Sequence, residues 1–127
     1  FIGDLHQPMH IGRYEDRGGN RVYVKWFGRN SNLHRVWDSE MINGYNMSYS
    51  ELAKNLPTPE KLEIEFERDD LISWVNEIHS YTREIYSGVS IDDNLGYEYQ
   101  YENFQTVKDL ILIGGLRLAS VLNYLFD

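Results

Sequence analysis

The sequence predicts a mainly α-helical chain with one small β-hairpin. Apolar residues recur at helical spacing in two long segments, residues 69–86 and 102–126. Residues 21–27 alternate β-forming residues with charged ones, and turn-forming residues follow at 28–32. The length of 127 residues is that of one ordinary domain, and no repeat or low-complexity segment divides the chain. These observations favour a single helical unit in which the hairpin is the only sheet.

The first third of the chain is expected to alternate short elements with a loop. Residues 1–5 are interpreted as the end of a helix that directs Asp4 inward, and Pro8 stops this helix because proline lacks a backbone N–H. Residues 11–19 hold three glycines and four charged residues, which indicates an exposed loop. After the hairpin, Asn32 is expected to cap a helix over residues 33–42.

The rest of the chain is predicted to be helical with one long connection. A short helix is expected at 50–56, and Thr58-Pro59-Glu60 has the composition of a helix start. A helix over 69–86 ends at Gly88. An acidic, tyrosine-rich connection at 89–101 then leads into a mostly buried helix over 102–126.

Two features of the last helix carry specific expectations. Gly114-Gly115 lowers helix propensity, so close packing against another helix is the natural reason for the pair. Arg117 either reaches a buried carboxylate or lies in solvent. His79, in the preceding helix, has no ligand partner nearby in the sequence and is interpreted as a surface or core-edge histidine.

Composition excludes some classes of function. The net charge of −8 argues against a basic surface of the kind that plain nucleic-acid-binding modules use. A metalloenzyme that cleaves a polyanion is compatible with this charge, because bound divalent ions can face the phosphate. The chain has no cysteine, so nothing indicates disulfides. No run of about 18 apolar residues predicts a membrane-spanning helix, and no signal peptide is visible.

Histidines and carboxylates are concentrated in the first 38 residues, which hold three of the four histidines. His34 and Asp38 are four residues apart, so on a helix their side chains leave the same face and can hold one ion. Asp4 and His10 lie on either side of Pro8, which lets neighbouring residues turn inward. Imidazole nitrogens with carboxylate oxygens suit zinc, and three protein ligands with an open position suit a catalytic ion.

Three motifs in this region make the interpretation specific. They are Gly3-Asp4-x-His6-Gln7-Pro8-x-His10, Gly18-Gly19-Asn20 and Asn32-Leu33-His34-x-Val36-Trp37-Asp38. In order and spacing they resemble the zinc-dependent single-strand-specific nuclease family typified by mung bean nuclease, within the phospholipase C/nuclease superfamily. Residues 114–126 resemble the closing helix of that family, whereas between about 45 and 95 the resemblance rests mainly on Trp74 and the helical pattern around it. The resemblance implies a helical phospholipase C/nuclease-like fold.

The resemblance implies a set of metal ligands. Asp4 would be catalytic, bridging two buried zinc ions whose bound water attacks the substrate. His10, His34 and Asp38 would hold a third zinc that stabilises the leaving 3′-oxygen. His6 is expected to support or pack against the ligands rather than to coordinate.

The resemblance also implies a substrate-binding loop beside the metal centre. Tyr14, Asp16 and Asn20 are the candidate substrate-binding residues, with Tyr14 stacking on a base. Two alternatives stay open. Tyr14 can be an ordinary surface tyrosine, and Asp16 and Asn20 can cap the backbone of their own loop. Trp37 is expected to pack beside the metal site.

The implied activity is hydrolysis of single-stranded DNA and RNA to 5′-mononucleotides, with 3′-nucleotidase activity, by a secreted or periplasmic enzyme. In the family pattern a metal-binding histidine stands immediately before Phe1. Residues 1–127 are therefore expected to be the C-terminal part of a single nuclease domain whose partner is its missing N-terminal part. Alone, they are expected to bind at most about one zinc ion and to show little activity. Two alternatives remain, a zinc-dependent phospholipase C and a non-catalytic helical module.

Overall fold

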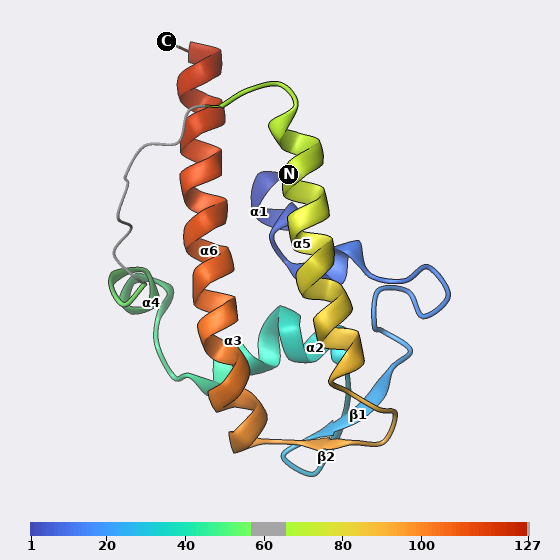
Figure 1. Ribbon diagram of the computed structural model, residues 1–127. Helices are drawn as coiled ribbons and strands as arrows, with labels where there is room; N and C mark the ends of the chain where they lie inside the picture. Colours follow the sequence, from blue (N-terminus) through green and yellow to red (C-terminus); the bar gives the residue numbers. More distant parts are fainter. Residues whose placement is uncertain (57–65, 127) are drawn as a thin grey trace.

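Two long helices frame the molecule in the computed structural model, which describes residues 1–56 and 66–126 (Figure 1). These helices are α5 (Asp70–Ser87) and α6 (Tyr97–Phe126). The N-terminal helix α1 (Ile2–Leu5) lies between them in Figure 1, where it packs on α6, and the 3₁₀ helix η1 (Pro8–Ile11) packs on α5. The mainly helical prediction is confirmed.

Helix α1 turns Asp4 to the outside rather than to the inside. Ile2 and His6 are buried, and their four-residue spacing places them on one face of the helix. Asp4 lies on the opposite side, with a side chain that is 71% exposed. The expectation that Asp4 points inward is therefore wrong for these residues. The inward face of α1 is the one that carries Ile2 and His6 and packs on α6. Pro8 occupies the first position of η1, where its missing N–H leaves no donor unpaired.

A small three-stranded sheet lies at the end of the molecule away from α1 (Figure 1). Strands β1 (Tyr23–Trp26) and β2 (Arg29–Asn32) form the predicted antiparallel hairpin. Phe27 and Gly28 join them with φ of 50° and 79°, and two positive values are what a type I′ turn requires. The predicted turn at 28–32 is thus wrong beyond Gly28, because a two-residue turn leaves the next four residues free to pair.

The third strand, β3 (Asn94–Leu95), was not predicted by the sequence pattern. It pairs in parallel with β1, matching Lys25 with Asn94, so the sheet is more than a hairpin. Leu95 is buried and anchors this edge of the sheet. A two-residue strand inside an acidic segment has no detectable periodicity, which is why residues 89–101 were interpreted as a plain connection.

The helical segment after the hairpin contains an unusual turn. The Asn32 side chain accepts a hydrogen bond from the Arg35 backbone N–H at 2.8 Å, which confirms the predicted cap. Helix α2 (Leu33–Arg35) then passes into a π-helical turn, η2 (Val36–Glu40), and into α3 (Met41–Gly44). π-Helical turns occur frequently at functional sites.

The remaining helices agree with the prediction in kind and differ at their ends. Helix α4 (Tyr49–Lys54) begins with a capping box formed by Ser48 and Glu51. The predicted helix start at 58–60 lies outside the described residues. Helix α6 begins five residues before its predicted start. The prediction missed its first turn because that turn is rich in exposed tyrosines and lacks an apolar stripe.

The hydrophobic core lies directly beneath the predicted ligands. Met9, Leu33 and Trp37 are buried, and each immediately precedes a predicted ligand, namely His10, His34 and Asp38. Each ligand is therefore held by a neighbour that is anchored in the core. The core cluster is Met9, Val24, Trp26, Leu33, Val36, Trp37, Met41, Leu52, Ile85, Tyr86, Leu95, Phe104 and Val107.

Helix α6 has one packed side and one exposed side. A Cβ added at Gly114 would lie 3.2 Å from Cγ of His6, so close packing against α1 accounts for this glycine. A Cβ at Gly115 would meet no heavy atom of the described residues within 4 Å. The expectation of close packing therefore holds for the first glycine of the pair only.

The length and composition of α6 would also allow it to cross a membrane. Only 17% of the apolar window that meets this test is buried, so the prediction that this helix is mostly buried is wrong. Phe104, Val107 and Leu110 pack the first half of α6 against the core. Its exposed apolar residues are Ile111, Leu118, Leu122 and Leu125.

Candidate metal centre

His10, His34 and Asp38 come together at one point. Each offers one ligand atom, and these atoms lie within 4.8 Å of one another. His10 comes from η1, His34 from α2 and Asp38 from η2, so three separate elements meet here. The two imidazole rings stack with centroids 5.4 Å apart, and Nε2 of His10 lies 3.9 Å from Oδ1 of Asp38. The predicted convergence of these three residues is observed.

Both histidines present the same nitrogen to this point. Nδ1 of His34 lies 2.9 Å from the carbonyl oxygen of Gly18, and since a carbonyl only accepts, Nδ1 must carry the proton. Nδ1 of His10 likewise lies 3.0 Å from the carbonyl oxygen of Asp4. In the neutral form of each ring, Nε2 is then the unprotonated nitrogen and is available as a ligand. Outer hydrogen bonds of this kind fix the tautomer and orientation of metal-binding histidines.

Asp4 does not belong to the convergent group in this structure. Its Oδ1 lies 2.9 Å from Nδ1 of His10, on the side of the ring away from Nε2. Together with its own backbone carbonyl, Asp4 thus orients His10. The structure gives Asp4 this outer contact, and its predicted role as a bridging ligand stays a prediction.

The donor set of the three convergent residues fits a zinc ion. Zinc bonds to nitrogen and oxygen are about 2.0–2.2 Å long, which places ligand atoms of a tetrahedral site about 3.3 Å apart. Closing the group from within 4.8 Å needs only small side-chain movements. Asp38 is also reached by Gln7, whose Nε2 donates to its Oδ1 at 3.3 Å. His10 and Asp38 are partly exposed, so the centre is open to solvent on one side.

The glycines of the 12–21 loop bring its backbone against the centre. Gly18 has φ of 64°, and a Cβ there would lie 2.5 Å from the carbonyl oxygen of Met9. Gly19, with φ of 85°, similarly packs against His34 and Met9. Only residues without a side chain permit this approach. The approach sets the Gly18 carbonyl beside the ring of His34.

Helix α5 supports the centre from behind through Thr82, which the sequence pattern did not single out, and through Tyr86, which belongs to the apolar spacing that predicted this helix. Thr82 is buried, and its Oγ1 lies 2.7 Å from the carbonyl oxygen of Pro8. The Tyr86 hydroxyl donates to Oδ1 of Asp16 at 2.8 Å and accepts from the Arg13 N–H at 3.1 Å. Burial raises the pKa of Tyr86 to about 12, and the hydrogen bond to Asp16 contributes to the increase. A polar residue inside the apolar stripe of a predicted helix is the signal that could have identified Thr82.

The candidate substrate-binding residues have different surroundings. Tyr14 is 93% exposed and lines the cleft beside the centre. Asp16 accepts hydrogen bonds from Tyr86 and from the Gly19 N–H, and Asn20 donates to the Arg17 carbonyl at 2.8 Å. These are the contacts of the loop-capping alternative. A substrate contact for Asp16 and Asn20 stays a prediction.

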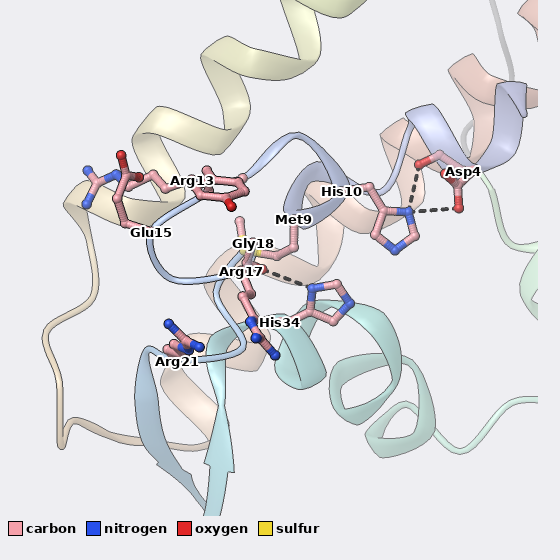
Figure 2. A pocket seen from close by; sticks show the side chains of 11 residues that line it. Asp4, Met9, His10, Arg13, Glu15, Arg17, Gly18, Arg21 and His34 are labelled. Atoms are coloured by element: carbon pink, nitrogen blue, oxygen red, sulfur yellow. Dashed lines mark hydrogen bonds and ion pairs between the residues drawn. The ribbon is translucent and has the colours of Figure 1, made fainter.

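An open cleft adjoins the centre (Figure 2). It has a volume of about 850 Å³, and its lining includes His10 and His34. Arginines of the 12–21 loop form much of the remaining wall. An anionic substrate can therefore reach both histidines from solvent. The other lining residues are Asp4, Met9, Gly12, Arg13, Tyr14, Glu15, Arg17, Gly18 and Arg21.

A second polar cluster joins α1 to the long helices. His6 receives a hydrogen bond on Nε2 from Arg117 at 3.0 Å, and its Nδ1 lies 2.7 Å from the carbonyl oxygen of Ile2. Arg117 also pairs with Glu77 and lies over the ring of Trp74. Burial is the main cause that lowers the pKa of His6, which keeps it neutral. His6 thus packs rather than joins the convergent group, and Arg117 reaches a carboxylate.

The helical fold with a His–His–Asp group beside an open cleft defines a candidate metallohydrolase. The model of the S1/P1 Nuclease family matches residues 1–127, and the chain belongs to this family. Endonuclease 1 of Arabidopsis thaliana is 35% identical over 150 residues, covering 100% of this chain and 47% of the relative. Endonuclease 2 of the same plant is 32% identical, covering 99% and 49%. Nuclease S1 of Aspergillus oryzae is 27% identical, covering 97% and 50%.

The chain therefore spans about half the length of the curated relatives it matches. The family and the names of these relatives support a nuclease, which is a hydrolase. They agree with the resemblance that the sequence motifs indicated.

Proposed function

We propose that the protein containing this chain is a zinc-dependent endonuclease that hydrolyses single-stranded DNA and RNA to 5′-mononucleotides and also acts on 3′-nucleotides. The observation that carries the proposal is the convergence of His10, His34 and Asp38 beside an open cleft that the two histidines line. An enzyme of this kind would serve DNA catabolism outside the cytoplasm, either secreted or in a periplasm.

The three convergent residues would hold one zinc ion. When bound, zinc stabilises the negative charge that develops on the leaving oxygen and on the phosphate. His10 and His34 would each donate the lone pair of Nε2, because their Nδ1 protons are directed at Asp4 and Gly18. Asp38 supplies the anionic ligand, and Gln7 holds its carboxylate in place.

Asp4 would have the second role in this proposal. Its exposed carboxylate lies next to His10 and would bridge two further zinc ions, with the other ligands supplied by the preceding part of the protein. A lone carboxylate cannot retain two ions in competition with water. Residues 1–127 alone are therefore expected to bind at most about one zinc ion and to show little turnover.

The decisive experiment replaces Asp38 by alanine in the whole protein. Loss of a well-placed charge stabiliser costs about 10²- to 10³-fold in rate, and we expect at least this loss together with one fewer zinc ion per protein. Release of acid-soluble nucleotide from single-stranded DNA measures the rate, and elemental analysis measures the zinc. Asp69→Ala is the matched control, since Asp69 is exposed and its side chain caps nothing.

Normal turnover and a full zinc content in Asp38→Ala would refute the assignment of this centre. Hydrolysis of phosphatidylcholine in preference to single-stranded DNA would favour the phospholipase C alternative instead. A protein that releases neither heat nor protons in a calorimetric zinc titration would be the non-catalytic module.

A further inference from the structure

Three arginines of one loop line the same cleft as the candidate metal ligands. Arg13, Arg17 and Arg21 recur every four residues within the 12–21 loop, and all three belong to the lining that contains His10 and His34. Figure 2 shows Arg17 and Arg21 in the same part of the cleft as His34. The chain as a whole carries a net charge of −8, so a cationic wall is an exception on this molecule.

The loop uses one of its two acids for its own structure. Asp16 accepts hydrogen bonds from the Gly19 N–H and from Tyr86, both at 2.8 Å, and does not line the cleft. Glu15 remains as the loop's acidic group in the lining. Asp4, at the far end of the cleft, is paired with His10. The lining of the cleft thus contains three arginines and, among the described residues, one carboxylate without an ion pair, that of Glu15.

None of the three arginines forms an ion pair within 4.0 Å with any residue that the structure describes. Arg13 lies over the ring of Tyr86, 4.3 Å from its centroid, and Figure 2 shows its guanidinium directed away from His10 and His34. Arg17 and Arg21 are exposed. Arginine remains charged at all physiological pH values, and its planar fork matches two oxygens of a phosphate. Neighbouring unpaired cations favour an anion between them.

The backbone at Arg17 has a conformation that is uncommon for arginine. Its φ is 54°, in the left-handed region where glycine and asparagine are common and other residues are strained. The loop backbone is held by close packing, since a Cβ at Gly12 would lie 2.4 Å from Cα of Gly18. A strained residue in a rigid loop beside a site points to a role for its side chain.

We propose that Arg17 and Arg21 bind a second phosphate of a single-stranded nucleic acid, next to the phosphate at the metal centre. This inference rests on the proposed nuclease function. The loop then gives preference to oligonucleotides, which carry a neighbouring phosphate, over 3′-mononucleotides, which do not. Tyr14 lies in the same lining and is exposed, so a base adjoining that phosphate could stack on it.

The test compares two substrates in the whole protein. Arg17→Gln and Arg21→Gln should each lower kcat/KM for a single-stranded oligothymidylate by about tenfold, mainly through KM, since a charge-assisted hydrogen bond is lost. Hydrolysis of a 3′-mononucleotide should not change. The slope of log kcat/KM against log salt concentration for the oligonucleotide should also become shallower by about 0.7 for each arginine removed.

Two further variants separate charge from structure. Arg29→Gln removes an exposed arginine of β2 outside the cleft, and it should leave both activities and the salt slope unchanged. Arg17→Lys keeps the charge without the fork, so it should retain the salt slope and recover part of the affinity. Thermal unfolding of every variant should match the parent, because the replaced side chains are exposed.

Equal losses on both substrates, or no loss on either, would overturn the phosphate subsite. If the parent hydrolyses neither substrate, the proposed nuclease function fails on its own. Fluorescence anisotropy of labelled oligothymidylate then tests the arginines directly. Weaker binding by the two Gln variants, with Arg29→Gln unchanged, would support the subsite, and unchanged binding by all three would overturn it.

Discussion

Alanine substitution at the adjacent glycines Gly114 and Gly115 of α6 should change the stability of the protein in opposite directions. A methyl group at Gly114 would lie 3.2–3.3 Å from Cγ and Cβ of His6, closer than side chains normally pack. His6 cannot easily move away, because both of its ring nitrogens are hydrogen-bonded, one to Ile2 and the other to Arg117. A methyl group at Gly115 enters open space among the described residues.

The magnitudes follow from two opposing terms. Replacing glycine by alanine inside a helix gains about 0.8–1.0 kcal/mol. Forcing an extra carbon into a packed contact costs about 1–3 kcal/mol. Gly115→Ala receives only the gain, so it should stabilise the protein by about 1 kcal/mol. Gly114→Ala receives both terms and should be less stable than Gly115→Ala by about 1–3 kcal/mol.

Urea unfolding of the purified protein measures this difference, provided that the slope of the transition is unchanged between variants. The decisive control is to repeat Gly114→Ala in a His6→Ala background. Removing the ring makes room for the methyl group, so the same substitution should now stabilise. Equal effects at the two glycines, or an unchanged cost without His6, would refute the close contact between α1 and α6.

Two smaller predictions concern the support that α5 gives to the centre. Thr82→Val should destabilise the protein by about 1–3 kcal/mol in thermal or urea unfolding, because the buried Pro8 carbonyl loses its hydrogen-bond donor. Valine is nearly the same size as threonine, so packing changes little. A neutral effect would show that water replaces the hydroxyl. Stability should also fall as pH rises from about 10 to about 12, because Tyr86 ionises at about pH 12 when folded and at about pH 10 when unfolded. Tyr86→Phe should reduce this fall by up to about 1.4 kcal/mol per pH unit. The remainder comes from Tyr99, whose pKa burial raises to about 12, and from Tyr81, whose pKa burial also raises. An unchanged pH profile of Tyr86→Phe in denaturant titrations would contradict the assignment.

Local chemistry explains what could be predicted from the sequence. Asn32 caps a helix because its short side chain reaches a free N–H three residues on, and this needs no tertiary information. The convergence of His10 with His34 and Asp38 was predicted from helical spacing and from the motif resemblance. The π-helical turn at 36–40 has no sequence signal, since its hydrogen-bond pattern is a response to packing.

What could not be predicted depends on contacts between distant segments. The direction of Asp4 follows from which face of α1 meets α6, and a four-residue helix is too short to show a stripe. The hydrogen bond between Asp16 and Tyr86 joins residues 70 positions apart, so no local pattern in the sequence could predict it. Gly114 and Gly115 look equivalent in the sequence, and only the position of His6 separates them.

The placement of a core residue immediately before each convergent side chain has a consequence for the amount of folded protein. An ion held by His10, His34 and Asp38 binds only when Met9, Leu33 and Trp37 are in their native positions. Such an ion stabilises the folded state by about 2.7 kcal/mol when its concentration is 100 times its Kd. The free energy of unfolding of typical domains is roughly 5–15 kcal/mol, so this contribution is a large share of it. Scarcity of the metal would therefore shorten the lifetime of the protein in the presence of proteases as well as lower its turnover.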